Sequence, residues 1–373
     1  MVAEVTTPSS DQDFMSLALA LGRRGLGNTW PNPAVGAVIV REEQGVPIIV
    51  GRGWTQVGGR PHAEAEALRR AGDAARGATM YVTLEPCSHH GRTPPCADAI
   101  VAAGVARVVS ALEDPNPEVA GAGHARLRAA GIAVEVGLGA DEARRAHAGH
   151  IRRMCDRRPH VTLKLAASAD GKAGAAGRRP VAITGEAARA RVHRLRAMND
   201  AILVGIGTAL ADDPQLTCRL PGMTAFSPVR VVLDSAQRLP LGGALVTSAR
   251  TTPVWVVAAA DATPEPARLL QEAGVVALQA PVSGGRLDLA AVLRLLAERG
   301  ITRLMVEGGP TVAASFVAAD LVDAAALFRS ARTIGSDGID ALQGMRLETL
   351  TGRLTSHGRE PIGEDSVEFF ARA

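Results

Sequence analysis

The stretch from residue 61 to residue 96 constrains this chain more than any other, because it holds side chains typical of a catalytic metal site. It reads PHAEAEALRR and, after a short gap, ATMYVTLEPCSHHGRTPPC. His62, Cys87 and Cys96 offer one imidazole and two thiolates, the ligands that zinc prefers. Three protein ligands leave the fourth tetrahedral position open for a water molecule. The sequence therefore predicts a zinc site of the catalytic kind.

Glu64 lies two residues past His62, so its carboxylate can reach this water without binding the metal. Zinc lowers the pKa of a bound water to about 7, and a carboxylate nearby can carry the proton to a leaving amine. This arrangement is typical of zinc-dependent nucleobase deaminases. The alternative is a structural zinc site, with His89 or His90 as a fourth ligand, but Glu64 would then have no evident role.

The expected local structure brings the ligands together. Pro61 and His62 precede a run rich in Ala, Glu and Leu that predicts a helix, and ATMYVTLEP predicts a strand. The segment from Thr93 to Cys96 is expected to open the next helix. Two neighbouring helix N-termini would then favour thiolate over thiol.

Composition narrows the class of protein. A length of 373 residues allows two domains, and 47% hydrophobic with 21% charged residues is ordinary for a soluble globular protein. A net charge of +3 and 3% aromatic residues argue against a nucleic-acid partner. Four cysteines are too few for a disulfide framework, and we find neither a signal-peptide pattern nor an apolar run long enough for a membrane. We therefore expect a cytoplasmic enzyme with no membrane partner.

Strands and helices alternate along the chain. Residues 11 to 25 predict a helix, and AVGAVIV followed by IIVGRGW predicts a hairpin, so the first domain is expected to be a layered α/β domain with a mixed sheet. Paired arginines between residues 141 and 159 could contact RNA, but we interpret them as a solvated helix face at a domain junction. We place the boundary near residue 155, which gives domains 1–154 and 155–373. Cys155 and Cys218 are interpreted as small buried or semi-exposed side chains without a functional role.

The alternation of strand and helix patterns in the second domain predicts a largely parallel sheet, with ligand sites at the carboxyl ends of its strands. The segment from Gly205 to Leu210 begins like a dinucleotide fingerprint but lacks the third glycine. Residues 307–311 read EGGPT between a predicted strand and a predicted helix, where backbone amides could approach a phosphate.

Both halves resemble one known family. The loop SHHGRTPP is longer than the spacer of most nucleobase deaminases and, with PNPAVGAVIV and DPNPEVAGAG, it resembles the deaminase half of the bifunctional riboflavin-biosynthesis deaminase/reductases. PHVTLKLAASADGK, ITGEAAR, LRAMNDAILVGIGTALADDPQLTCR, VRVVLDS and MVEGGPT resemble the reductase half, in the same order. The resemblance covers about residues 12 to 371. It implies a cytidine-deaminase-like domain with zinc, a dihydrofolate-reductase-like domain with NADPH, a phosphorylated pyrimidine substrate, and a homo-oligomer, either a dimer or a tetramer.

The resemblance also implies roles for individual residues. The residues implied to face the substrate in the deaminase half are Asn32, His89, Arg92, Asp114 and Asn116. The residues implied to hold the cofactor in the reductase half are Ala166, Thr208, Asp212, Ser235, Gly309, Pro310 and Thr311, within a turn that runs to Ser315. Those implied to hold the substrate there are Arg196, Leu216, Arg219 and Glu307. For Asn32, Asp114 and Asn116 the alternative is simple turn chemistry.

Lys164, on the first strand of the second domain, could polarise the sugar or supply a proton, and its alternative is a surface lysine. One stretch departs from the family pattern, because Ala182 stands where relatives usually carry a Trp, and Pro180 stands where they carry a small polar residue. Two other classes stay open: a deaminase with a non-catalytic second domain, and an RNA-editing deaminase.

Overall fold

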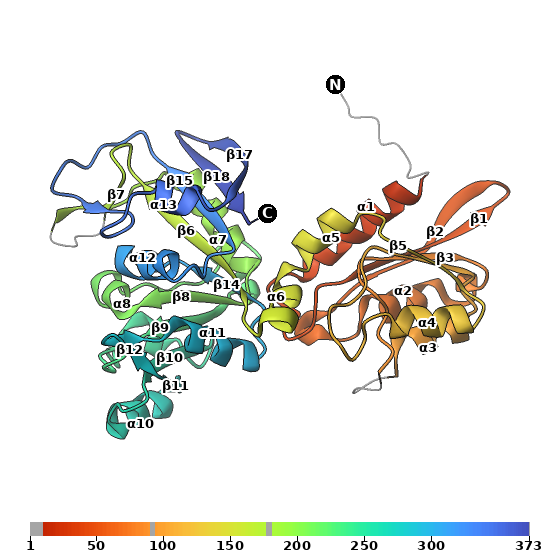
Figure 1. Cartoon of the computed structure of the whole chain (residues 1–373), viewed down its shortest axis with the longest axis horizontal. Helices are drawn as coiled ribbons and strands as arrows, with labels where there is room; N and C mark the ends of the chain where they lie inside the picture. The colour runs from red at the N-terminus through yellow and green to blue at the C-terminus, as the bar shows by residue number, and fades with distance from the viewer. Residues whose placement is uncertain (1–9, 90–93, 177–180, 373) are drawn as a thin grey trace. The chain divides into compact units, whose positions relative to one another are not determined.

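The computed structural model describes residues 10–89, 94–176 and 181–372, and the chain divides into two compact units, Met1–Arg157 and Arg158–Ala373 (Figure 1). The division that the sequence suggested after residue 154 falls inside the last helix of the first unit, α6 (Ala148–Asp156). In the described residues, no helix is both long and apolar enough to cross a bilayer.

The first unit is built on a five-stranded mixed sheet with strand order β2-β1-β3-β4-β5. Its strands are β1 (Gly36–Glu43), β2 (Val46–Trp54), β3 (Thr79–Val82), β4 (Arg107–Ser110) and β5 (Ala133–Val136). β1 runs antiparallel to both β2 and β3, whereas β3, β4 and β5 are parallel. The predicted hairpin and the predicted mixed sheet are therefore confirmed.

Helices cover both faces of this sheet. They are α1 (Asp11–Gly22), α2 (Ala63–Ala71), α3 (Cys96–Ala103), α4 (Ala122–Ala129), α5 (Ala140–Ala146) and α6. Alternate residues of β1 enter different cores: Val38 packs with α1 and α5, and Ile39 packs with α2, α3 and α4. Because successive strand residues point to opposite faces, α1 and α5 lie on one side of the sheet and α2 to α4 on the other.

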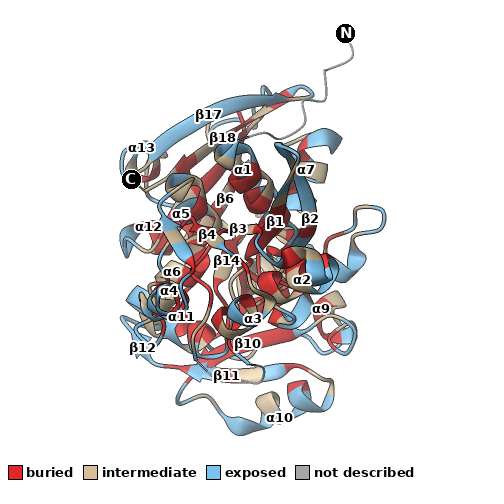
Figure 2. Ribbon diagram, turned by 90° about the vertical axis from the view of Figure 1, so that its right-hand side faces the viewer, coloured by how far each residue is buried: buried red, intermediate tan, exposed pale blue. Residues whose placement is uncertain are grey.

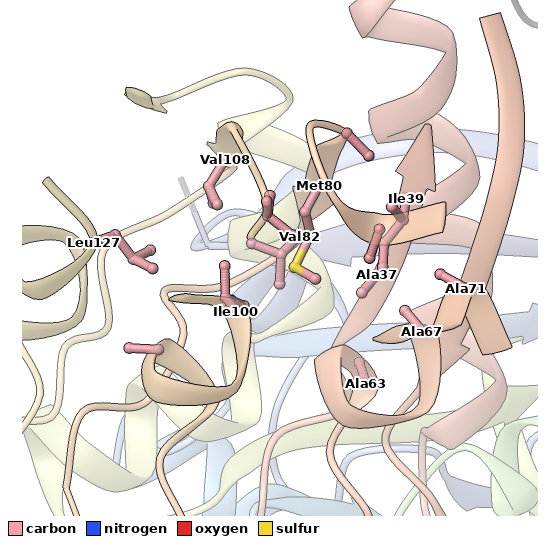
Figure 3. Packing of buried hydrophobic residues seen from close by; sticks show 14 of the residues in the cluster. Ala37, Ile39, Ala63, Ala67, Ala71, Met80, Val82, Ile100, Val108 and Leu127 are labelled. Atoms are coloured by element: carbon pink, nitrogen blue, oxygen red, sulfur yellow. The ribbon is translucent and has the colours of Figure 1, made fainter. Parts of the chain in front are cut away.

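The helix that carries the predicted site packs its alanine side chains against the sheet, with Ala63, Ala67 and Ala71 facing Ala37 and Ile39 (Figure 3). Ala63 and Ala67 of α2 are fully buried against the strands. On the strand side, a Cβ atom at Gly53 would lie 2.2 Å from the carbonyl oxygen of Ala63, and one at Gly51 would lie 2.3 Å from that of Ala67. Small residues on both sides thus let α2 pack against β2 through backbone contact, which fixes the position of its first turn.

The second unit is built on a nine-stranded sheet with order β11-β10-β9-β8-β14-β6-β15-β18-β17. Its strands are β6 (His160–Ala167), β8 (Ala201–Gly205), β9 (Val229–Leu233), β10 (Val254–Ala259), β11 (Val276–Ala280), β14 (Arg303–Val306), β15 (Ala324–Arg329), β17 (Thr355–Ile362) and β18 (Asp365–Ala371). Neighbours from β11 to β15 are parallel, and β18 and β17 add an antiparallel edge. Two small pairs accompany the sheet: β7 (Lys172–Gly174) with β16 (Ile339–Asp340), and β12 (Val282–Ser283) with β13 (Arg286–Leu287).

The helices of this unit are α7 (Glu186–Ala197), α8 (Ile206–Asp212), α9 (Ala244–Thr247), α10 (Pro264–Glu272), α11 (Leu289–Glu298), α12 (Pro310–Ala318) and α13 (Glu348–Thr351). The central strand β8 is buried along its whole length. So is β10, whereas the edge strand β17 is exposed along nearly all of its length (Figure 2). Since β6, β8, β9 and β14 are parallel, their carboxyl ends meet at one edge of the sheet, where ligands bind in open α/β sheets.

Candidate metal centre and reductase cavity

The three predicted zinc ligands lie together. His62 is the residue that precedes α2, Cys96 is the first residue of α3, and Cys87 lies in the loop after β3. His62 Nδ1 lies 3.7 Å from Cys87 Sγ and 3.4 Å from Cys96 Sγ, and the three ligand atoms lie within 4.8 Å of one another. Tetrahedral zinc with its usual bond lengths separates a nitrogen and a sulfur ligand by roughly 3.6 Å. The donor set therefore fits zinc in both chemistry and spacing.

The pKa values of the two ligand thiols shift in opposite directions. The backbone N–H of Cys96, at the N-terminus of α3, donates to Cys87 Sγ at 3.3 Å. Hydrogen bonds from Cys96 and His62 lower the pKa of the Cys87 thiol to about 4, whereas contact with Cys87 and burial raise the pKa of Cys96. A second negative sulfur beside the first is unfavourable until a divalent cation binds both, so the pair suits a metal.

Glu64 lies on the first turn of α2 beside the ligands, and only 4% of it is exposed. Burial raises the pKa of Glu64. The charge of His62 lowers this pKa and the charge of Cys87 raises it, and the overall shift is upward. A carboxyl group with a raised pKa, beside the three candidate ligands, is suited to moving protons near neutral pH.

A second cluster of possible metal ligands, formed by Glu85, Glu113 and His124, is better explained without an ion. Glu85 Oε1 accepts the N–H groups of Gly123 (2.8 Å) and His124 (3.1 Å). Its Oε2 accepts those of Gly121 (2.9 Å) and Asp114 (3.1 Å). Four backbone donors occupy the carboxylate, which ties segment 114–124 to the strand end that leads to Cys87. Sequence reasoning missed this role, and the available signal was an acid between the apolar run TMYVTL and Pro86.

Three of the residues implied to face the pyrimidine make hydrogen bonds within the protein. Asn32 Nδ2 donates to the carbonyl of Gly59 at 2.8 Å. Asp114 is buried, and its Oδ1 accepts the N–H of Asn116 at 2.9 Å and lies 2.8 Å from His150 Nε2. The turn chemistry that we considered for Asp114 and Asn116 is thus present.

The remaining two of these residues lie in the long loop between Cys87 and Cys96. His89 is exposed. Arg92 lies outside the described residues, as does Pro180 of the second unit.

A cavity of about 650 Å³ lies at the carboxyl ends of the parallel strands of the second unit. Predicted site residues that line it are Lys164, Ala166, Thr208, Asp212, Glu307, Gly309, Pro310 and Thr311. Gly308 and Gly309 precede α12, and a Cβ at Gly308 would lie 3.0 Å from Val312 Cβ, so the glycine lets the end of β14 pack closely against the first turn of the helix. A helix N-terminus beside a cavity of this size fits a dinucleotide phosphate.

Ser235 and Ala182 also border ligand space. Ser235 lines a neighbouring cavity of about 410 Å³, which shares Leu233, Thr311 and Val312 with the larger one. Ala182 lines the larger cavity, so the missing Trp of the family pattern would have stood in its wall.

Arg196 and Glu307 form a bidentate ion pair. Arg196 Nε lies 3.1 Å from Glu307 Oε1, Nη2 lies 2.6 Å from Oε2, and Nη1 donates to the carbonyl of Thr217 at 3.0 Å. Burial raises the pKa of Glu307, but the charges of Arg196 and Lys164 outweigh it and lower the pKa overall. Three N–H groups of the Arg196 guanidinium are therefore bound to protein groups.

Lys164 faces the cavity rather than open surface. Burial lowers the pKa of Lys164, while the charge of Glu307 opposes that shift.

The other two residues implied to hold the substrate differ in exposure. Leu216 is buried in a hydrophobic core, whereas Arg219 is exposed, and its Nη1 lies 3.4 Å from both Gln215 Oε1 and Thr217 Oγ1. Cys155 is exposed and Cys218 is buried.

A sulfur and imidazole metal site beside a buried acid, in an α/β unit, and a nucleotide-sized cavity at the ends of a parallel sheet define a metal-dependent deaminase joined to a reductase. Comparison with known proteins agrees for each half. Residues 8–112 match the cytidine and deoxycytidylate deaminase zinc-binding region, and residues 159–367 match the RibD C-terminal domain.

Similarity to whole proteins extends across both halves. The riboflavin biosynthesis protein RibD of Escherichia coli is 43% identical over 348 residues, covering 90% of this chain and 92% of its own. That of Aquifex aeolicus is 40% identical over 362 residues, covering 97% and 98%. The solved structure of Acinetobacter baumannii RibD has a TM-score of 0.85 at 37% identity, covering 97% of this chain and 99% of that chain. The chain therefore belongs to the RibD family: it is a bifunctional deaminase and reductase of riboflavin biosynthesis, with a zinc-binding deaminase domain and a reductase domain that uses NADPH.

Proposed function

We propose that the chain carries out two successive reactions on one phosphorylated pyrimidine. The first is hydrolytic deamination of 2,5-diamino-6-(5-phosphoribosylamino)pyrimidin-4-one, and the second is reduction of the ribosyl side chain to a ribityl group. A solved Thermotoga maritima relative, 34% identical with a TM-score of 0.82, is described as a diaminohydroxyphosphoribosylaminopyrimidine deaminase and 5-amino-6-(5-phosphoribosylamino)uracil reductase. The observation that carries the proposal is the cluster of His62, Cys87 and Cys96 beside the buried Glu64.

In the deaminase unit, His62, Cys87 and Cys96 would hold the zinc ion, which would supply the Lewis acidity that activates a water molecule. Glu64 takes a proton from that water and passes it to the amino group, which leaves as ammonia. The raised pKa of Glu64 supports this role, because it brings the carboxyl closer to the pH at which it must both accept and donate.

Loops around the metal centre border the substrate in this proposal. Asn32 and His89 contact the pyrimidine, and the turn formed by Asp114 and Asn116 closes the site from another side. Arg92 is assigned to the phosphate because a guanidinium binds phosphate oxygens in pairs.

In the reductase unit, the larger cavity would hold NADPH, which would supply the hydride for C1′ of the opened ribosyl chain. Lys164 donates the proton that the departing ring oxygen takes up, and its lowered pKa supports this role. Glu307, oriented by Arg196, accepts an N–H group of the pyrimidine ring, while the exposed Arg219 binds the phosphate and the buried Leu216 supports its loop.

The larger cavity is assigned to the nicotinamide half of the cofactor. Contacts are proposed for Ala166, Thr208, Asp212 and the turn Gly309, Pro310 and Thr311, all of which line it. The backbone that leads into α12 suits the pyrophosphate.

We also propose that the protein acts in the cytoplasm as a homo-oligomer, a dimer or a tetramer. Free thiols at the metal site support a reducing compartment, because the two ligand cysteines must stay unoxidised to bind zinc. Light scattering of the purified protein tests the oligomeric state, and cell fractionation tests the location.

The function is tested by supplying the diaminopyrimidine phosphate with and without NADPH and identifying products by mass spectrometry. Without NADPH we expect the amino group to be replaced by oxygen, and with NADPH we expect two further hydrogens. A deaminase with a non-catalytic second domain would stop at the first product in both reactions. No mass change in either would refute the proposal.

A further inference from the structure

The smaller cavity of the reductase unit has a chemistry of its own. It measures about 410 Å³ and is bordered by the end of β9, the β12–β13 hairpin, the first turn of α11 and one face of α12. Leu233, Thr311 and Val312 line both this cavity and the larger one. The two cavities are therefore neighbouring parts of one elongated binding region along the start of α12.

The walls of the smaller cavity combine apolar and polar surface. Leu287, Leu289 and Leu321 contribute apolar side chains, which suit the flat face of a base. Ser235 and Ser283 contribute hydroxyl groups, and within the described part of the chain Arg286 is the one cation in the lining. A guanidinium with neighbouring hydroxyls is suited to a phosphate monoester.

Arg286 is poorly occupied by protein groups. Its guanidinium lies 3.4 Å from the hydroxyl of Ser315, which is long for a hydrogen bond, and that hydroxyl donates to the carbonyl of Thr311 at 2.9 Å. The residue is exposed on β13, so several of its five donors can face a ligand.

The acid in the same lining is committed elsewhere. Asp288 Oδ1 accepts the N–H groups of Ala290 (2.9 Å) and Ala291 (3.1 Å), so the carboxylate caps α11. These hydrogen bonds hold the carboxylate at the helix terminus, and Arg286 is the cation of the described lining that can bind an anion.

We propose that the smaller cavity binds the adenosine end of NADPH and that Arg286, assisted by Ser235, recognises its 2′-phosphate. This inference rests on the proposed function only in assigning the larger cavity to the nicotinamide half. NADH carries a hydroxyl at the position of that phosphate, so Arg286 gains a charge-assisted partner from NADPH alone. Arg286 is thereby the residue that selects NADPH over NADH.

Binding of cofactor fragments to the full chain tests this without catalysis. Isothermal titration calorimetry with adenosine 2′,5′-bisphosphate and with 5′-AMP compares the wild type, Arg286→Gln and the control Arg268→Gln. Arg268 is an exposed cation on α10 that pairs with Glu265 and Glu272. We expect Arg286→Gln to weaken the bisphosphate by about 10- to 100-fold, as loss of hydrogen bonds to a charged group would.

The control substitution should change neither affinity, and 5′-AMP should bind wild type and Arg286→Gln alike. Unchanged bisphosphate affinity in Arg286→Gln would overturn the proposal. So would an equal loss for both fragments, because Arg286 would then not read the 2′-phosphate.

Steady-state kinetics on the deaminated substrate separate this inference from the proposed reductase function. The wild type should prefer NADPH, and Arg286→Gln should lose that preference through a higher KM for NADPH, with kcat and the KM for NADH retained. A wild type that prefers NADH contradicts the inference alone. A wild type that oxidises neither nucleotide contradicts the reductase function, while the calorimetry still decides the role of Arg286.

Discussion

Glu85 shows how one buried carboxylate can hold a loop beside a metal centre. It is two residues from the ligand Cys87, its side chain is fully buried, and it accepts four backbone N–H groups from segment 114–124. That segment contains Asp114 and Asn116, which we propose border the substrate. Glu85 is thus a positioning residue that links the metal loop to the opposite wall.

We predict that Glu85→Gln destabilises the deaminase unit and weakens substrate binding. A carboxamide keeps one acceptor oxygen and replaces the other by an N–H₂ group that faces donors. The cost is about 1–3 kcal/mol for each of the two backbone N–H groups left without an acceptor. Chemical denaturation should show the loss, and kinetics should show a raised KM for deamination with zinc content unchanged.

The matched control is Glu113→Gln, because Glu113 belongs to the same cluster but is exposed. It should leave stability and KM near wild type. If Glu85→Gln lowered zinc content and kcat while sparing KM, the carboxylate would serve the ligands themselves rather than the loop.

At the residue scale, the sequence predicts contacts that its local spacing determines. His62 and Glu64 belong to one short motif, and the resemblance of the loop supports Cys87 and Cys96. The pair of Arg196 and Glu307 could not be found in this way, because 111 residues separate the two and only the order of the strands brings them together.

At the element scale, regular patterns predict elements well. The hairpin predicted from AVGAVIV and IIVGRGW is present as β1 (Gly36–Glu43) and β2 (Val46–Trp54). The antiparallel edge was missed, because β17 is exposed along nearly its whole length and so shows no alternation of apolar and polar residues. The close contact between β2 and α2 could not be predicted either. Gly51 and Gly53 are visible in the sequence only as small residues in a strand, which does not show that a helix packs on them.

Gly53→Ala tests that contact between β2 and α2. The new Cβ would lie 2.2 Å from the carbonyl oxygen of Ala63 and 2.7 Å from the N atom of Ala67, so backbone must move. We expect a loss of about 1–3 kcal/mol or more from overpacking. Because the displaced helix carries His62 and Glu64, zinc affinity should fall as well.

Thermal unfolding and competition with a zinc-binding dye measure the two effects. Gly242→Ala is the control, since a Cβ there would meet nothing within 4 Å. Wild-type zinc affinity in Gly53→Ala would mean that the position of α2 does not govern the site.

Asp323 joins the starts of two neighbouring strands and makes the second unit sensitive to acid. Its oxygens accept from Arg158 at 2.6 Å and 2.7 Å, and from the N–H of Val161 at 2.9 Å. Burial raises the pKa of Asp323, but these hydrogen bonds and nearby positive charge outweigh it and lower the pKa overall.

A carboxyl whose pKa is lower in the folded state stabilises that state above its unfolded pKa, about 3.9, and the effect is lost as the pH falls through the folded value. We predict that Asp323→Asn is less stable than wild type at neutral pH and that the difference narrows below about pH 4. Denaturant titrations at several pH values measure this. A difference that stays constant with pH would assign the effect to packing rather than to charge.

At the scale of the whole molecule, two units with separate hydrophobic cores carry two separate sets of chemical groups. The residues of the metal centre all belong to the unit that ends at Arg157, and the residues of the cavity all belong to the unit that begins at Arg158. All residues that we assign to one reaction belong to one unit. A single substitution should therefore remove one activity and leave the other.

We therefore predict that Glu64→Ala lowers deamination by about 10²- to 10⁴-fold, the usual contribution of a general acid–base group, and leaves NADPH oxidation on the deaminated substrate unchanged. Lys164→Met should slow NADPH oxidation and leave deamination unchanged. A chelator should lower deamination as Glu64→Ala does and spare NADPH oxidation, because zinc belongs to the deaminase half alone. Ammonia release and loss of NADPH absorbance follow the two reactions in the same preparation. If Glu64→Ala or chelation also slowed NADPH oxidation on supplied intermediate, the two units would be coupled through the chain, and separate cores would not imply separate activities.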